Sequence, residues 1–241
     1  YPFFSHEKAG KFRVAVCRNL SCHLGGAPAV IKRIEEALGV PEGKATADGL
    51  RTAMADGEAA ARGVQVAVSN NVFAAALELK QRGGGQIVTL NAEMTMAARA
   101  NPELGAAIAQ ADLVIPDGAG VVWALGRQGF RVRRSPGIEL ARQLLVYAAA
   151  HRWRVALVGA SPEVMGRLVE RLRAEVPALD LAFTIHGYQD PEQWPGLEQQ
   201  LLQARPDLVL VALGVPRQEI WIQRLHPGQP GLWMGVGGSF D

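Results

Sequence analysis

The chain has 241 residues, a formal net charge of +2, and 49% hydrophobic residues. This length suits one large α/β domain or two small ones, and so small a net charge gives no reason to expect a nucleic-acid partner. Two cysteines do not make a disulfide framework, so a reducing cytosol is the expected compartment.

The N-terminal part of the chain predicts one strand, over 12–16, and one amphipathic helix, over 27–39. One strand and one helix cannot bury a core alone. The stretch 42–63 is rich in glycine, alanine and small polar residues and shows no apolar periodicity. We therefore predict a linker over 50–63, between an N-terminal segment, 1–49, and a larger domain, 64–241.

Both cysteines of the chain, Cys17 and Cys22, follow the first predicted strand at a spacing typical of thiolate ligands. An iron–sulfur cluster generally takes four thiolates, and a structural zinc takes four cysteine or histidine ligands. Only His23 among the five histidines lies beside the pair. We therefore expect an incomplete ligand pair, with no metal and no cofactor bound by this chain.

From Val64 onward, apolar runs alternate with helical patterns. The predicted strands are 64–68, 86–90, 112–116, 154–159, 181–185, 207–213 and 232–236, and the helical patterns between them include 71–81, 138–151, 162–176 and 196–204. Ser161 and Asp190 each precede a Pro-Glu pair, which predicts a helix start at both places. Apolar strands alternating with helices predict an open, mostly parallel, Rossmann-like α/β sheet with helices on both faces.

In such sheets, ligands bind outside the carboxyl ends of the strands. The segments that follow the predicted strands are rich in glycine and polar residues: 89–94, 116–120, 159–163, 186–190, 214–219 and 235–241. Since all of them meet at one edge of the sheet, we predict a binding site there. The segments contain no phosphate-binding lysine loop. They also lack the dinucleotide-binding glycine fingerprint and a nucleophile elbow, which disfavours hydride transfer and serine hydrolysis.

Asp117 is the first candidate for chemistry at this edge. It follows an apolar strand in the sequence PDGAG, where glycines let a ligand approach the backbone. A carboxylate there can take a proton from a sugar hydroxyl as the hydroxyl attacks, which is the work of a general base. The alternative is that Asp117 is the N-cap of a helix that begins in the same sequence.

Thr89 and Asn91 end the preceding strand and offer a hydroxyl and an amide for a sugar or a ribose. By strand alternation their side chains are expected on the same side. The alternative is that both residues only form the turn. Trp123 and Trp221, the remaining candidates for sugar contacts, are expected in the core.

The segment GVPRQE combines a tight turn with the start of a helix. Gly214 and Pro216 are predicted to set the turn, and Arg217 is available to a phosphate. Gln218 and Glu219 then lie in the first helical turn. The alternative for Glu219 is that it only stabilises the helix dipole.

Taken together, these motifs resemble the WecG/TagA/CpsF family of bacterial glycosyltransferases. The resemblance runs in unbroken order from residue 64 to 241, through IVTLNAEM, ADLVIPDGAGVVWA, RSPGIEL, VALVGASPEV, PDLVLVALGVPRQEIWI and GVGGSFD. It implies an inverting transferase that moves N-acetylmannosamine, or a related sugar, from a UDP donor. The implied acceptor is N-acetylglucosamine on undecaprenyl diphosphate, in the synthesis of teichoic acid or a related surface polymer.

The family resemblance also implies roles for residues. Asp117 matches the catalytic base, and Thr89 and Asn91 match active-site residues. Gln218 lies in the motif expected near the nucleotide. Together with the segments that follow the strands, this gives the predicted substrate-binding residues Gly118, Gly120, Gly159, Tyr188, Gly214, Pro216, Arg217, Gln218, Glu219 and Gly237. The implied partners are a UDP-sugar and a lipid-linked acceptor at the inner face of the cell membrane, while the oligomeric state stays open. Since no apolar run reaches the ~18 residues of a membrane span, membrane contact is expected to be peripheral.

One feature departs from the family pattern. Family members continue past GGSFD into a basic C-terminal segment, whose arginines neutralise the UDP diphosphate and which helps the protein to reach the membrane. We expect residues 64–241 to form the domain without this segment, and residues 1–241 to show weak or no turnover.

Residues 1–49 resemble a different family, the thioredoxin-like two-iron ferredoxin subunit of respiratory NADH dehydrogenase. That family pairs its C-x4-C with a later C-x3-C, and here only Cys17 and Cys22 are present. The resemblance implies a partial thioredoxin-like fragment and gives an alternative function, an electron-transfer module. An iron assay and a visible absorption spectrum would separate the two functions.

Overall fold

The computed structural model describes residues 71–127 and 130–240, and before residue 71 only the backbones of four short strands. These are β1 (Phe12–Val14), β2 (Leu50–Thr52), β3 (Glu58–Ala61) and β4 (Val64–Ala67). β1 pairs with β2 in parallel. The predicted helix over 27–39, Cys17 and Cys22 lie outside the described residues. The predicted linker, 50–63, contains β2 and β3, and the domain boundaries stay a prediction.

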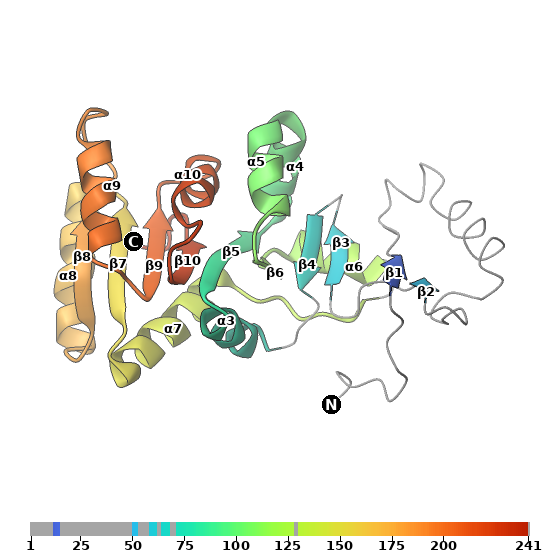
Figure 1. Ribbon diagram of the computed structural model, residues 1–241, viewed down its shortest axis with the longest axis horizontal. Helices are drawn as coiled ribbons and strands as arrows, with labels where there is room; N and C mark the ends of the chain where they lie inside the picture. Colours follow the sequence, from blue (N-terminus) through green and yellow to red (C-terminus); the bar gives the residue numbers. More distant parts are fainter. Residues whose placement is uncertain are drawn as a thin grey trace.

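The larger part of the chain forms one open sheet of six parallel strands in the order β6-β5-β10-β9-β7-β8 (Figure 1). Its strands are β5 (Gly84–Leu90), β6 (Leu113–Pro116), β7 (Arg154–Gly159), β8 (Asp180–Ile185), β9 (Leu208–Ala212) and β10 (Gly231–Gly235). Each corresponds to a predicted strand, so the expected open parallel sheet is confirmed. In five of the six strands, almost every residue is buried or half-buried, as strands covered on both faces require.

The prediction for 64–68 is wrong in one respect. The strand exists as β4, but it pairs antiparallel with β3 and is no part of the six-stranded sheet. The physical reason is proximity: β3 ends three residues before β4 begins, and two strands that close in sequence pair most readily as an antiparallel hairpin. An apolar run predicts a strand without fixing its partner.

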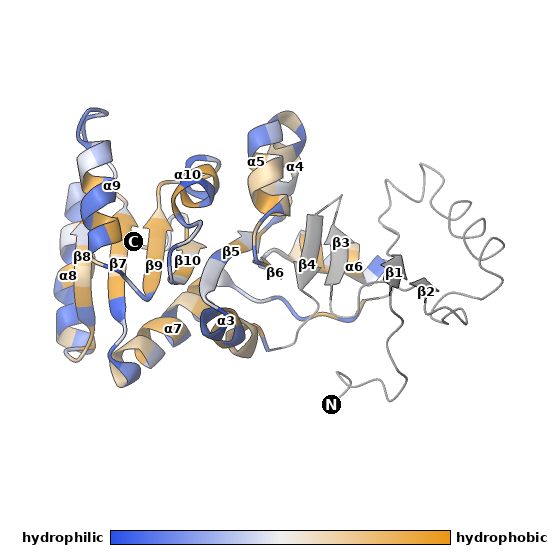
Figure 2. Cartoon of the chain, in the orientation of Figure 1, coloured by the Kyte–Doolittle hydropathy of each residue, from blue (hydrophilic) through white to orange (hydrophobic). Residues whose placement is uncertain are grey.

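Eight described helices connect the strands and cover both faces of the sheet. They are α3 (Val72–Gln81), α4 (Ala92–Ala100), α5 (Pro102–Ala109), α6 (Ala119–Arg127), α7 (Gly137–His151), α8 (Pro162–Glu175), α9 (Trp194–Gln203) and α10 (Arg217–Leu225). One face packs against α3, α7 and α8. The other face packs against α4, α5 and α6 at one end and against α9 and α10 at the other. Figure 2 shows the apolar strands β7 and β9 beside helices with hydrophilic sides, such as α8, α9 and α10.

Alternation along β5 fixes the surroundings of the predicted site. Ile87 joins the core under α7, whereas Val88 and Leu90 join the core under α4, α5 and α6. Thr89 therefore lies on the α7 face. No helix within the described part of the chain is both long and apolar enough to cross a bilayer.

Side-chain caps set several helix starts. The Ser161 hydroxyl accepts a hydrogen bond of 3.3 Å from the Val164 N–H, which confirms the predicted start of α8. The start predicted at Asp190 is wrong, because α9 begins at Trp194. The Asp190 carbonyl instead accepts a bond of 2.9 Å from the Gln193 N–H, so the residues between form a turn before the helix.

Candidate functional site

The predicted segments meet at the carboxyl edge of the sheet in an order set by the strands. Asp117 follows the edge strand β6, and Asn91 follows its neighbour β5. The segment 236–240 follows β10, and Gly214 comes two residues after β9. Tyr188 lies beyond β8, the outermost strand on the other side of the sheet from β6. Since neighbouring strands lie about 4.8 Å apart, the edge offers a row of loops on which an extended ligand can lie.

Asp117 is fixed by backbone contacts to two neighbouring segments. Its N–H donates to the Leu90 carbonyl at 3.0 Å. Its half-buried carboxylate accepts a hydrogen bond from the backbone N–H of Gly137, the first residue of α7. The Ser135 N–H donates to the Pro116 carbonyl at 2.8 Å, which holds the segment before α7 against the end of β6. The carboxylate therefore faces α7. The first turn of α6 is closed separately: the N–H groups of Val121 and Val122 donate to the Gly118 carbonyl at 3.0 and 3.2 Å.

Burial raises the pKa of Asp117 above its ordinary value, and the negative charge of Glu139 acts in the same direction. The Gly137 amide and the guanidinium of Arg134 oppose this shift without cancelling it. A carboxylate with a raised pKa is a stronger base than a free aspartate, which is what proton abstraction near neutral pH needs.

Thr89 is the neighbour of Asp117 on the α7 face. Its side chain is buried, with its hydroxyl 3.4 Å from the Gly235 carbonyl, to which it donates. A Cβ atom built on Gly137 would lie 2.6 Å from Cγ2 of Thr89, so only glycine fits there without a shift. Thr89 and Asp117 thus contact the same residue, Gly137, from two adjacent strands.

Asn91 has a structural contact of its own. Its side-chain oxygen accepts a bond of 2.8 Å from the Met94 N–H and caps α4. This contact agrees with the alternative interpretation, in which Asn91 forms the turn, and it leaves the side-chain NH₂ group for a ligand. A Cβ on Gly118 would lie 3.1 Å from the Asn91 Cβ, so Gly118 allows these two loops to approach closely.

A cavity of about 510 Å³ opens at the ends of β7, β8, β9 and β10. It is lined by Ala160, Ser161, Val164, Gly187, Tyr188, Ala212, Leu213, Gly214, Arg217, Gly237, Gly238 and Phe240. Four predicted substrate-binding residues are among them. Tyr188 is 75% exposed, so its ring is free to stack, and Arg217 stands at the start of α10. The N-termini of α8 and α10 both meet this cavity, and such termini favour anions.

The remaining predicted glycines and Pro216 act through the backbone. Gly159 has a φ of +116°, and a Cβ there would lie 2.3 Å from the Ala212 carbonyl oxygen, so glycine lets β7 end close against β9. Gly120 lies in α6, where a Cβ would be 3.1 Å from the Ala92 Cβ. The Val215–Pro216 peptide bond is cis.

Gln218 and Glu219 lie beneath the cavity rather than in its wall. Each is 1% exposed. The Gln218 amide donates to Oε1 of Glu219 at 2.7 Å, and its oxygen accepts a bond of 3.2 Å from the Gly237 N–H. These predicted substrate-binding side chains therefore hold the glycine turn that lines the cavity. A Cβ on Gly235 would lie 2.6 Å from the Gln218 amide nitrogen, so this contact also needs glycine.

Sequence reasoning missed the polar core around Glu219. The Gln86 amide, fully buried on β5, donates to the Glu219 carbonyl at 3.1 Å. Oε2 of Glu219, Oε1 of Gln86 and Nε1 of Trp233 are buried and have no hydrogen-bond partner among the described residues. Burial raises the pKa of Glu219 to about 7, although the bond from Gln218 lowers it. The signal available in the sequence was a glutamine at the start of the apolar run QIVTL.

Gly137 was also missed, although it stands in the quoted motif RSPGIEL. Its importance depends on Thr89 and Asp117, which are distant in sequence. The expectation that Trp123 lies in the core is wrong, because it is 67% exposed, with the Arg127 guanidinium 5.9 Å from its ring centroid. Trp221 does pack in the core, and its Nε1 donates to Glu198 at 2.8 Å.

Comparison with known proteins supports both resemblances. The profile of the glycosyl transferase WecG/TagA/CpsF family matches residues 61–241, and that of the thioredoxin-like 2Fe-2S ferredoxin matches residues 1–55. The chain is also 34% identical, over 165 residues, to the N-acetylglucosaminyldiphosphoundecaprenol N-acetyl-β-D-mannosaminyltransferase of Bacillus spizizenii. The aligned region covers 68% of this chain and 63% of that relative, so the match spans less than two thirds of the relative's length.

Proposed function

The chain belongs to the WecG/TagA/CpsF family of glycosyl transferases, and we propose that it transfers N-acetylmannosamine, or a related sugar, from a UDP donor with inversion at the anomeric carbon. The proposed acceptor is N-acetylglucosamine on undecaprenyl diphosphate, as in the name of the Bacillus relative. The product would serve teichoic acid or surface polysaccharide synthesis. The observation that carries this proposal is the half-buried carboxylate of Asp117 on the same sheet edge as the glycine-lined cavity.

Asp117 is the proposed general base. As the acceptor hydroxyl attacks C1 of the donor sugar, Asp117 takes its proton, the new C1–O bond forms, and the bond from C1 to the diphosphate oxygen breaks. UDP leaves with the electron pair of that bond. The Gly137 amide orients the carboxylate, and burial strengthens it as a base. Thr89 packs closely against Gly137 and so helps to position the start of α7, where the Gly137 amide lies.

The 510 Å³ cavity is the proposed donor site. Tyr188 offers an exposed ring on which the uracil can stack. Arg217 and the N-termini of α8 and α10 offer positive charge for the diphosphate. With the uracil near β8, the sugar would extend along the edge toward β5 and β6, where Thr89 and Asp117 lie.

The lipid-linked acceptor places the proposed reaction at the inner face of the cell membrane. The protein would meet that surface peripherally, from the cytoplasm. The open row of loops at the carboxyl ends of the strands is compatible with such an acceptor. Its sugar would enter the site while its lipid stays at or near the bilayer.

Two measurements on the purified chain test the proposed function. Calorimetric titration should show UDP binding, with CMP binding more weakly. Prolonged incubation with UDP-N-acetylmannosamine and a lipid-linked N-acetylglucosamine diphosphate should yield the disaccharide lipid, detected by mass spectrometry. Failure to bind UDP would refute the donor site, and transfer from a different nucleotide sugar alone would refute the assigned donor.

A further inference from the structure

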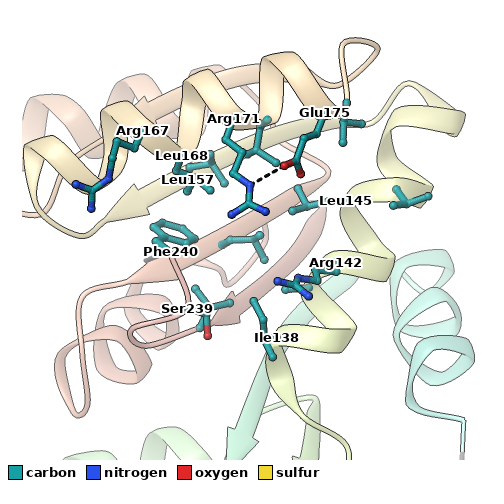
Figure 3. A pocket seen from close by; sticks show the side chains of 16 residues that line it. Ile138, Arg142, Leu145, Leu157, Arg167, Leu168, Arg171, Glu175, Ser239 and Phe240 are labelled. Carbon is teal, nitrogen blue, oxygen red and sulfur yellow. Dashed lines mark hydrogen bonds and ion pairs between the residues drawn. The ribbon is translucent and has the colours of Figure 1, made fainter.

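A second cavity, of about 570 Å³, lies between α7 and α8 on the opposite side of the segment 236–240 from the donor cavity. It is a groove whose floor is formed by Leu157 and Leu210 of the sheet and by Val236. Leu145 and Val146 of α7 and Leu168 and Leu172 of α8 form its apolar walls. Figure 3 shows Phe240 and Ser239 at one end of this α7/α8 groove.

The groove combines this apolar floor with an excess of positive charge. Arg142, Arg167 and Arg171 line it, against one carboxylate, Glu175. Arg171 is paired with Glu175 at 2.7 Å (Figure 3). Within the described residues, Arg142 and Arg167 make no ion pair. The hydrogen bond from Ser161 is the main cause that lowers the pKa of Glu163, and the positive charge of Arg167 adds a smaller effect. The groove therefore suits an amphiphile with an anionic group.

The two unpaired arginines lie at matching depths. Arg142 is five residues from the start of α7, and Arg167 is five residues from the start of α8. Both helices start at the carboxyl edge, so the Cα atom of each arginine lies about 7 Å below that edge. The apolar residues Val146, Leu172 and Val176 lie deeper in the groove. Apolar and charged residues are mixed along the groove, since Ile138 and Phe240 lie at the edge end with Arg142 and Arg167, and the Arg171–Glu175 pair lies as deep as Leu172.

The upper end of the groove adjoins the candidate site. Ile138 lines the groove and directly follows Gly137, whose amide holds the Asp117 carboxylate. Val236 lines it and follows Gly235, whose carbonyl accepts the Thr89 hydroxyl. Phe240 lines both the groove and the donor cavity. This end of the groove therefore lies beside the segments that contact Asp117 and Thr89 and beside the donor cavity.

We propose that the α7/α8 groove binds the diphosphate and the first isoprene units of the lipid-linked acceptor. The inference rests on the proposed function and names the subsite that holds the acceptor. Arg142 and Arg167 bind the diphosphate, the sugar lies above them at Asp117, and the isoprenoid chain follows the apolar walls before it leaves the groove. Charge complementarity, the apolar walls and the position of the groove beside the candidate site carry the assignment.

The test uses isopentenyl, geranyl and farnesyl diphosphate, with inorganic diphosphate as the chain-free probe, in calorimetric titrations of the full chain. Each added isoprene unit should lower the Kd about fivefold, since apolar surface enters the groove. Farnesyl diphosphate should bind equally well when UDP is saturating, because the two cavities are separate. Equal affinity for all chain lengths, or displacement of farnesyl diphosphate by UDP, would overturn the proposal.

Variants give the second arm. Arg142→Ala with Arg167→Ala should weaken farnesyl diphosphate about tenfold or more, and Val146→Glu, at a 64% exposed position that tolerates a charge, should remove the dependence on chain length. Arg173→Ala is the matched control, an exposed arginine of α8 outside the groove. Unchanged binding in the groove variants would refute the subsite. The subsite would also be refuted if the Val146→Glu variant dissociated an oligomer in sedimentation and still bound farnesyl diphosphate. The groove would then hold a second copy of the chain.

UDP titrations in the same samples separate this inference from the proposed function. If UDP binds and farnesyl diphosphate does not, the groove assignment fails and the donor site stands. If UDP does not bind, the proposed function itself fails.

Discussion

Thr89 and Gly137 are packed so closely that a single added carbon atom would not fit, since a Cβ on Gly137 would lie 2.6 Å from Cγ2 of Thr89. The same glycine donates its N–H to the Asp117 carboxylate. The end of β5, the end of β6 and the start of α7 therefore meet at one residue without a side chain. The position of the proposed base depends on that contact.

Gly137→Ala should displace the start of α7 and disturb the hydrogen bond to Asp117. We expect the free energy of unfolding to fall by about 1–3 kcal/mol, the usual effect of overpacking, and proton abstraction to be impaired. Gly166→Ala is the matched control, because a Cβ at Gly166 in α8 meets nothing within 4 Å, and there alanine should stabilise the helix by about 0.5–1 kcal/mol. Urea unfolding measures both changes. An equally stabilising Gly137→Ala would contradict the packing described.

Tyr188→Ala should weaken UDP binding if the exposed ring carries the uracil. Loss of one base–aromatic stack corresponds to about 1–3 kcal/mol, or at least a fivefold rise in Kd. Trp123→Ala removes an aromatic side chain of similar exposure, 67% against 75%, near the opposite edge of the sheet, and should leave the UDP affinity unchanged. Calorimetry would show the difference, and equal effects of the two substitutions would remove Tyr188 from the donor site.

Glu219 should make the stability of the protein depend on pH. Burial raises its pKa from 4.5 to about 7, so the folded protein binds this proton more tightly than the unfolded chain. The corresponding stability is fully present below about pH 4.5 and is lost as the pH rises through about 7, roughly 3 kcal/mol in all. Glu219→Gln should flatten this dependence and be more stable relative to the parent at pH 8 than at pH 5.

The matched control for that experiment is Glu170→Gln, at an exposed position of α8. Its unfolding free energy should follow that of the parent at every pH. If the Glu219→Gln profile also followed the parent, the buried carboxyl would not be the source of the pH dependence.

The fold was largely predictable because its strands are apolar and separated by helical patterns. Each strand from β5 to β10 shows that local signal, and the meeting of their carboxyl ends follows from parallel pairing alone. The partner of β4 was not predictable, since strand pairing depends on the rest of the chain. Trp123 was misplaced for a related reason: a large apolar side chain indicates burial only on average.

The positions of the candidate residues in the fold were more predictable than their contacts. Asp117 directly follows β6 and Tyr188 lies three residues beyond β8, so their place at the carboxyl ends of the strands could be predicted. Gln218 and Glu219 stand in the first turn of a helix, where polar residues are usually exposed, and only the packing of α10 on β5 and β10 shows them buried. The role of Gly137 depends on two residues that precede it by 48 and 20 positions, and no local pattern reports such a contact.

The most direct test of the central claim compares the parent with Asp117→Asn in two assays on the same preparations, UDP affinity by calorimetry and disaccharide–lipid formation by mass spectrometry over long incubations. Asparagine keeps the shape of the side chain and cannot accept the proton, so UDP affinity should stay within about twofold while product formation falls by at least about 100-fold. Product formation at the parental rate by Asp117→Asn would contradict the account.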